Sequence, residues 1–69
     1  MENLIAFIGF GEAAFHIAKG LKLEGLSNIV AYDLNQNDDK KGIIIKTRAD
    51  EISIILKDSA IVMLNSYYP

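Results

Sequence analysis

The sequence predicts an α/β fold in which helices cover both faces of a parallel sheet. Its expected strands, such as residues 4–8 and 29–32, are unbroken apolar runs rather than alternations of apolar and polar residues. Such runs are typical of strands buried on both faces, as in a parallel sheet between helices. A helical pattern over residues 12–23 separates the two runs, and strand–helix–strand units build parallel sheets.

The first half of the chain has the clearest element boundaries. Residues 4–8 are the first expected strand, and a glycine turn follows at residues 9–11. Over residues 12–23, apolar side chains recur at spacings of three and four, as on a helix that lies against a sheet. The expected apolar stripe consists of Ala14, Ile17, Ala18 and Leu21. Gly25 can take the left-handed conformation that ends a helix, and residues 29–32 form the second strand.

The second half is predicted to hold two more strands and one more helix. Residues 35–42 are polar and rich in turn formers, so a loop or a single turn is expected there. The β-branched run at residues 43–45 predicts a third strand. Asp50 can cap a helix that continues to about residue 58. The apolar run at residues 60–64 predicts a fourth strand.

These elements predict a sheet with strand order 3-2-1-4, since crossovers between parallel strands are right-handed in nearly all proteins. The helix over residues 12–23 is expected on one face of the sheet and the helix over residues 50–58 on the other. The fourth strand would leave an apolar edge uncovered. Because an open edge can pair with another chain, homo-oligomerisation through that edge is also expected.

Length and composition limit the classes of function. The 69 residues suffice for the first half of such a domain, since domains usually need about 100–150 residues. Residues 1–69 are therefore expected to be a fragment of a longer protein, or the product of a truncated reading frame. The net charge is −2 and no Lys/Arg cluster is present, so nucleic acid is not an expected partner.

Cysteine and membrane signals are missing from the sequence. The absence of cysteine excludes disulfides and thiolate chemistry. The longest apolar run near the start is far shorter than the roughly 20 residues that span a bilayer. A soluble, cytoplasmic protein without a membrane partner is therefore expected.

Residues 5–14 combine the features of a dinucleotide-binding turn. The first strand leads directly into the pattern Gly9-x-Gly11-x-x-Ala14, and the second strand ends at Asp33. Gly9 permits the tight turn, and Gly11 lets a pyrophosphate approach the backbone. The amides that follow are unpaired donors at a helix N-terminus, which carries roughly half a positive charge. Strand, glycine turn, helix, strand and acid together predict a Rossmann-type sheet that binds a dinucleotide.

The acid at the end of the second strand favours NAD over NADP. Asp33 lies twenty-two positions after Gly11, close to the roughly 20 expected for the acid that binds the adenosine ribose. Its carboxylate can accept hydrogen bonds from ribose hydroxyls and would repel a 2′-phosphate. The lysines at residues 40–41 could neutralise such a phosphate, but the aspartates at residues 38–39 cancel most of their charge.

Five further residues are weighed as part of the site. Glu12 would add negative charge beside the pyrophosphate, so it fits only with its side chain turned to solvent. Leu34 could pack against an adenine. Asn65 and Ser66 follow the predicted fourth strand, where open α/β sheets place ligands, although a plain polar loop is the alternative. His16, the only histidine, lies beside the apolar stripe and is expected to be exposed.

Residues 9–21 resemble the opening signature of the 6-phosphogluconate dehydrogenase-like, or β-hydroxyacid dehydrogenase, superfamily. In that signature Gly-x-Gly-x-Met-Gly is followed by x-x-Met-Ala-x-Asn-Leu. The direct matches are Gly9, Gly11, Ala18 and Leu21. Ile17 is a conservative match, whereas Ala13, Ala14 and Gly20 depart from the signature.

The resemblance implies the cofactor-binding part of an NAD(P)-dependent oxidoreductase that acts on a hydroxy acid or related carbonyl compound. Members carry their catalytic lysine in a helical C-terminal domain, which is expected to be absent here, so no catalytic residue and no metal ligand is expected. The positions that carry over as the pyrophosphate loop are Gly9, Phe10, Gly11, Glu12, Ala13 and Ala14. Asp33 carries over to the ribose, and Asn65 and Ser66 carry over to the loop that runs towards the nicotinamide. Members that use NADP tend to have Asn-Arg where this chain has Asp33-Leu34, which again favours NAD.

Three alternatives remain open at the level of sequence. A non-enzymatic nucleotide-sensing module would share the same first half, and only residues beyond Pro69 would distinguish it. A methyltransferase also uses a glycine loop, but an acidic residue usually precedes its first glycine, where this chain has Phe7 and Ile8. A fragment without independent function would leave its site half built.

Overall fold

The computed structural model describes the backbone of residues 4–67 and the side chains of residues 4–64, which form a small α/β fold. Its elements, in chain order, are β1 (Ile5–Ile8), α1 (Glu12–Leu23), β2 (Ile29–Tyr32), α2 (Lys41–Glu51), β3 (Ile55–Leu56) and α3 (Ala60–Tyr67). The predictions for α1 and β2 are confirmed to the residue, and β1 begins one residue later than predicted.

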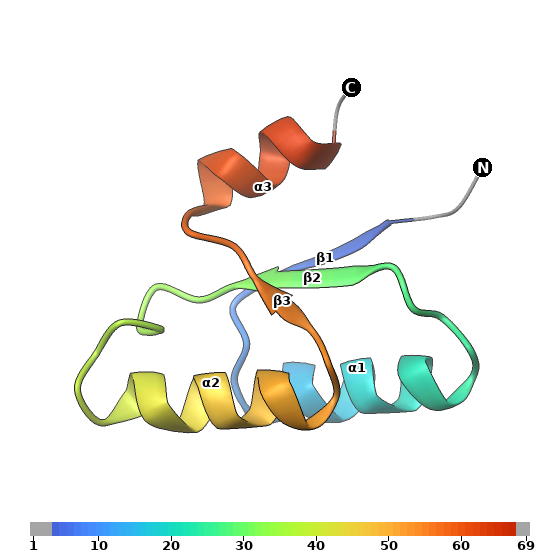
Figure 1. The fold of residues 1–69 in the computed structure, drawn as a ribbon, viewed down its shortest axis with the longest axis horizontal. Helices are drawn as coiled ribbons and strands as arrows, with labels where there is room; N and C mark the ends of the chain where they lie inside the picture. The colour runs from blue at the N-terminus through green and yellow to red at the C-terminus, as the bar shows by residue number, and fades with distance from the viewer. Residues whose placement is uncertain (1–3, 68–69) are drawn as a thin grey trace.

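The three strands described form one parallel sheet with β2 in the centre. The order is β1-β2-β3, with Ile5 paired to Ile29 and Val30 paired to Ile55. Both α1 and α2 lie along one face of this sheet, and α3 lies on the other face (Figure 1). Helices therefore cover both faces, as expected. However, the helix predicted over residues 50–58 on the face opposite α1 is not formed, and the second helix, α2, lies on the same face as α1.

The central strand β2 has buried side chains on both faces of the sheet, one covered by α1 and α2 and the other by α3. Ile29 and Ala31 belong to the main core, which α1 and α2 complete with Phe15, Ala18, Ile45 and Ala49. Val30 is also buried, and because successive side chains of a strand point to opposite faces, it lies on the side of α3. Met63 of α3 is 1% exposed and packs over that side.

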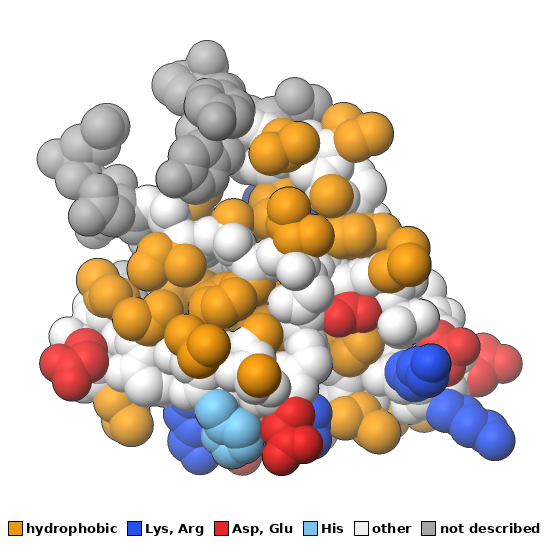
Figure 2. Space-filling view, turned by 180° about the vertical axis from the view of Figure 1, so that it is seen from behind, with side chains coloured by type: hydrophobic (Ala, Val, Ile, Leu, Met, Phe, Trp, Pro, Cys, Tyr) orange, Lys and Arg blue, Asp and Glu red, His pale blue; other side chains and the backbone are white. Residues whose placement is uncertain are grey.

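Apolar surface remains at the edge of the sheet and on α3. Seen from behind, hydrophobic side chains gather near β1 and again over α3 (Figure 2). The most exposed large ones are Ile8, Leu23, Leu34, Ile43 and Ile61. In the described part of the chain the sheet edges are β1 and β3, so the open edge expected at a fourth strand does not exist there.

The strand predicted at residues 43–45 is wrong, because these residues lie in α2. Asp38 stabilises the start of the helix, because its Oδ2 accepts hydrogen bonds from the backbone N–H groups of Lys40 at 3.0 Å and Lys41 at 2.9 Å. Early amides of a helix have no intrahelical partner, so a carboxylate at this place favours helix over strand.

The apolar pattern of α2 contains the helical signal that its β-branched run obscured. Ile45 and Ala49 are buried and Ile52 is half-buried, at spacings of four and three. Ile43 and Ile44, elsewhere on the surface of the same helix, are exposed. Burial of one helical face therefore outweighs the strand propensity of three consecutive isoleucines.

The helix predicted over residues 50–58 is also wrong, because α2 ends at its start and the chain returns into β3. Ser53 takes a φ of 56°. Its N–H donates to the Asp50 carbonyl at 3.1 Å, and the N–H of Ile54 donates to the Ala49 carbonyl at 2.9 Å. These two bonds form a Schellman motif, which ends a helix.

The fourth strand predicted at residues 60–64 is replaced by α3. The Ser59 hydroxyl accepts a hydrogen bond from the N–H of Val62 at 3.1 Å, and the Ser59 carbonyl accepts one from Met63, also at 3.1 Å. Ser59 therefore caps a helix where the apolar run alone suggested a strand. The described residues do not form the predicted order 3-2-1-4.

Candidate functional site

The candidate site lies at the carboxyl ends of the parallel strands. The glycine turn at residues 9–11 follows β1, Asp33 follows β2, and Lys57 follows β3. Because parallel strands end at the same edge of the sheet, these three connections come together. The N–H of Gly9 donates to the carbonyl of Tyr32 at 2.6 Å, which extends the pairing of β1 and β2 into the turn.

Gly9 and Gly11 meet different conformational demands. Gly9 has a φ of 98°, a left-handed conformation in which any L side chain would be strained. Gly11 has a φ of −82° and a ψ of −166°, which any residue can adopt. A Cβ atom on Gly11 would meet no described heavy atom within 4 Å. The fold thus requires glycine at position 9, whereas at position 11 it leaves open space above the backbone.

The N-terminus of α1 borders this open space. Gly11 is its N-cap residue, and no side chain caps the first turn. The Gly11 carbonyl accepts a hydrogen bond from Phe15 at 2.9 Å, while the amides of Glu12 and Ala13 have no partner within the helix. Ala14 is half-buried and packs against the core.

The side chain of Glu12 lies along the helix rather than over the turn. It is 74% exposed, and its Oε1 is 3.9 Å from Nε2 of His16, one helical turn further on. The condition that its carboxylate turn to solvent is therefore met. His16 is 64% exposed, which confirms its predicted position on the helix surface.

Asp33 lies directly against the glycine turn. Its Oδ2 accepts a hydrogen bond from the backbone N–H of Phe10 at 2.6 Å, and its Oδ1 accepts one from the N–H of Asn35 at 2.8 Å. Each carboxylate oxygen has two lone pairs, so both can accept a further hydrogen bond. Asp33 and the glycine turn at residues 9–11, which are distant in sequence, therefore lie side by side at the same edge of the sheet. Leu34 extends from it and is 84% exposed.

Phe10 contributes to the turn through its backbone. Its side chain is fully buried, with edge-to-face ring contacts to Phe7 and Phe15 at centroid distances of 6.2 and 6.4 Å. A ligand over the turn could therefore meet the backbone of Phe10 and not its ring. The aromatic contacts anchor the turn in the core, because displacing it would expose all three rings.

Gln36 is part of this region, although the sequence placed it in an unremarkable polar loop. It is the only buried polar or charged residue among those described, at 6% exposed. Its Oε1 accepts a hydrogen bond from the N–H of Asp33 at 3.0 Å, and its Nε2 donates to the carbonyl of Lys57 at 2.7 Å. Its neighbours in sequence are equally polar, so no local pattern distinguished it.

Asn65 and Ser66 do not follow a strand as predicted. Their backbone lies in the last part of α3, and their side chains are outside the described part of the chain. The structure therefore brings the residues of the glycine turn together with Asp33 and Leu34, but it does not place Asn65 and Ser66 in a loop after a fourth strand.

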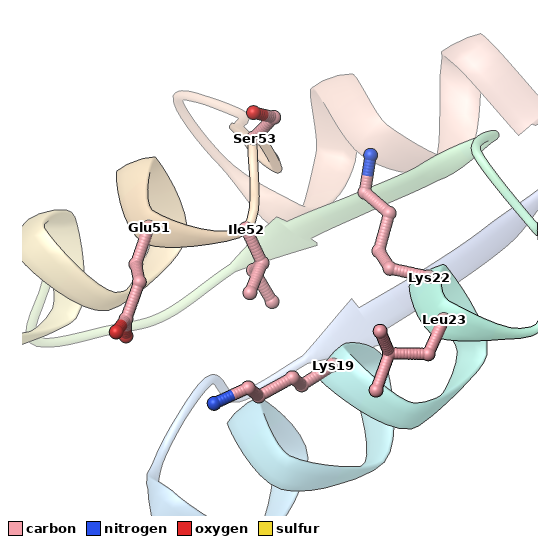
Figure 3. Close-up of a pocket in the computed structure, with 6 residues that line it drawn as sticks. All are labelled: Lys19, Lys22, Leu23, Glu51, Ile52 and Ser53. Atoms are coloured by element: carbon pink, nitrogen blue, oxygen red, sulfur yellow. The ribbon is translucent and has the colours of Figure 1, made fainter.

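A shallow groove lies at the opposite end of α1 from the glycine turn (Figure 3). It has a volume of about 430 Å³ and is lined by Lys19, Lys22, Leu23, Glu51, Ile52 and Ser53. The ammonium groups of Lys19 and Lys22 point in different directions, and the carboxylate of Glu51 lies on the other wall (Figure 3). The groove contains no residue predicted for the site.

The described residues contain neither a membrane-spanning helix nor a cluster of metal-binding side chains. Their helices are too short or too polar to span a bilayer, and no three of their His, Cys, Asp or Glu side chains are grouped to hold a metal ion. Comparisons with protein-family models, with curated proteins and with solved structures gave no match to this chain.

Proposed function

We propose that this chain is the cofactor-binding part of an NAD(P)-dependent oxidoreductase, with a Rossmann-like arrangement of its strands and helices and with NAD as the favoured cofactor. The observation that carries the proposal is the open space above Gly11 at the uncapped start of α1, in the turn that contacts the Asp33 carboxylate through Phe10. The φ of Gly11 is ordinary and no described atom occupies the place of a Cβ, so folding alone does not call for glycine there. A ligand that must approach the backbone does call for it.

The groups around Gly11 suit a dinucleotide. The uncapped amides of Glu12 and Ala13 offer donors and a positive helix end to a pyrophosphate. The hydrogen bond from Phe10 to the Asp33 carboxylate supports a role for this acid at the adenosine ribose, because the carboxylate lies beside the turn and can accept further hydrogen bonds. A 2′-phosphate at the same place would meet that carboxylate, which supports NAD over NADP.

The chain's own contribution would be to bind and orient the cofactor, which supplies hydride chemistry when bound. The resemblance of residues 9–21 to the β-hydroxyacid dehydrogenase superfamily supports a hydroxy acid or related carbonyl compound as the substrate. A nucleotide-sensing module would use the same binding surface, and no described residue favours it over an oxidoreductase.

The test is a titration of NADH, and separately of NADPH, into the purified chain, followed by nicotinamide fluorescence and calorimetry. We expect NADH to bind more tightly than NADPH. The Gly11→Ala variant should weaken NADH binding at least tenfold, about 1.4 kcal/mol, because its methyl group occupies the space of the pyrophosphate.

Gly20→Ala is the matched control. Gly20 lies on the same helix, and a Cβ there also meets nothing within 4 Å of the described atoms. This variant should bind NADH as the unsubstituted chain does. Equal binding by Gly11→Ala and Gly20→Ala, or no binding of either dinucleotide by a folded chain, would contradict the proposal.

A further inference from the structure

The amide group of Gln36 connects the ends of β2 and β3. On one side it accepts from the N–H of Asp33 at 3.0 Å, and on the other it donates to the carbonyl of Lys57 at 2.7 Å. The partners fix the orientation of the amide, because an N–H requires an oxygen opposite it and a carbonyl requires an NH₂ group. Both ends of the buried side chain are thus satisfied by backbone.

This connection continues through Asp33 to the glycine turn. The backbone of Asp33 is held by Gln36, and its carboxylate holds the N–H of Phe10 at 2.6 Å. The N–H of Lys57 in turn donates to the carbonyl of Ala31 at 2.8 Å, so the end of β3 is itself fixed to β2. A displacement of Gln36 would therefore move the carboxylate relative to the turn.

The backbone of Gln36 is also confined by α2. A Cβ atom on Gly42 would clash with the Gln36 carbonyl oxygen and would lie 2.9 Å from its carbon. Glycine at this helical position allows α2 to pack closely on the loop. Gln36 is therefore fixed by the helix on its backbone side and by two strand ends on its amide side.

We infer that Gln36 is a positioning residue for nucleotide binding, which sets the place of the Asp33 carboxylate that receives the adenosine ribose. This inference rests on the proposed function. Hydrogen bonds to ribose hydroxyls depend on a carboxylate held within about 0.5 Å of its productive place. Gln36 lies in the same loop as Asp33 and ties the backbone of Asp33 to the end of β3. Gln36 itself does not touch the ligand.

The experiment compares two ligands, NADH and its 2′-deoxyadenosine analogue, which lacks one hydroxyl at the ribose. The unsubstituted chain should bind NADH more tightly than the analogue. In Gln36→Met, which keeps the length of the side chain and removes both hydrogen bonds, NADH affinity should fall about tenfold. The affinity for the analogue should fall by less than about threefold. Asn37→Met, an exposed neighbour in the same loop, should change neither affinity.

A purely structural role for Gln36 would lower both affinities by the same factor, and that result would overturn the inference. If Gln36→Met does not fold, Gln36→Glu serves in its place. It keeps the acceptor for the Asp33 N–H and loses the donor to Lys57, so discrimination between the two ligands should again decrease. Unchanged discrimination in this folded variant would overturn the inference as well.

Amide hydrogen exchange in the ligand-free chain separates this inference from the proposed function. Exchange at Phe10 should accelerate in Gln36→Met, whereas exchange at Gly9, which bonds to Tyr32, should not. Unchanged exchange at Phe10 would overturn the link between Gln36 and the turn. If exchange responds but neither dinucleotide binds the unsubstituted chain, the failure lies in the proposed function, and the positioning role falls with it.

Discussion

Gly9 and Gly11 lie two residues apart, yet the backbone needs only the first of them. The tight turn at Gly9 and the left-handed φ of Gly25 were both expected from the sequence, because turns and helix ends restrict the residue types that fit them. The burial of Phe10 and the role of Gln36 were not, because they depend on packing between segments distant in sequence. Ile17 is 57% exposed, and Phe15 takes its place in the core, a shift of half a turn that periodicity alone did not resolve.

Asp33→Asn should change the preference between cofactors. The substitution keeps the size of the side chain and removes the charge that would repel a 2′-phosphate. NADPH affinity should rise relative to NADH affinity by about tenfold, measured by the same fluorescence titration. An unchanged ratio would show that this carboxylate does not face the 2′ position. Asp39→Asn, in the exposed turn before α2, provides a control with the same change in net charge.

The two helices on the shared face end in the same motif with different residues. In α1, Gly25 takes the left-handed position, and the N–H of Leu26 donates to the carbonyl of Leu21 at 3.0 Å. In α2, Ser53 takes that position. The end of α1 was predictable because glycine marks such a site, whereas serine at the corresponding place in α2 gave no signal. A helix was therefore wrongly expected to begin at Asp50, close to where α2 in fact ends.

Glycine-to-alanine substitutions in these two helices should have opposite effects on stability. Gly20→Ala adds a methyl group in open space on α1 and should stabilise the chain by about 0.5–1 kcal/mol through helix propensity. Gly42→Ala places its methyl group against the Gln36 backbone and should destabilise the chain by about 1–2 kcal/mol. Urea unfolding of both variants tests this, and changes of the same sign would contradict the close packing at Gly42.

Acidification should remove the contribution of Asp38 to the start of α2. Hydrogen bonds from the backbone N–H groups of Lys41 and Lys40 hold the pKa of this carboxyl below its ordinary value of 3.8. Because the pKa is lower in the folded state, the stabilisation is complete above about pH 3.8 and is lost as the pH falls through the folded value.

Asp38→Asn isolates this effect, because asparagine retains an acceptor oxygen and does not titrate in this range. Unfolding followed by circular dichroism should show a weaker loss of stability at acidic pH in the variant than in the unsubstituted chain. Identical acid dependence in the two proteins would exclude a role for the Asp38 carboxylate in α2.

Over the whole molecule, parallel pairing and helices on both faces follow from the unbroken apolar strands, and the sequence supported that inference correctly. The residues assigned to the later elements were wrong, because short apolar runs such as residues 43–45 and 60–64 suit both a strand and a half-buried helix. Hydrogen bonds accepted by Asp38 and Ser59, single polar residues just before the helices, add to the burial of one helical face in favouring helix over strand.

The packing of α3 against the sheet depends on one large buried side chain. Met63 of α3 is 1% exposed, whereas Ile61 on the same helix is 71% exposed. Met63→Ala should cost about 2–5 kcal/mol, as large as the total stability of many domains of this size. Ile61→Ala should stay within about 0.5 kcal/mol. Thermal unfolding of the two variants tests whether α3 contributes to stability. If α3 did not contribute, both variants would unfold at the same temperature as the unsubstituted chain.

The path of hydrogen bonds from Phe10 through Asp33 and Gln36 to Lys57 also determines how the molecule opens. It joins the ends of all three strands, including β3, which is only two residues long. The rim of the sheet therefore cannot fray one strand at a time without breaking this path. Opening there is expected as a single cooperative event, so any molecule bound at the glycine turn would also hold the short third strand in place.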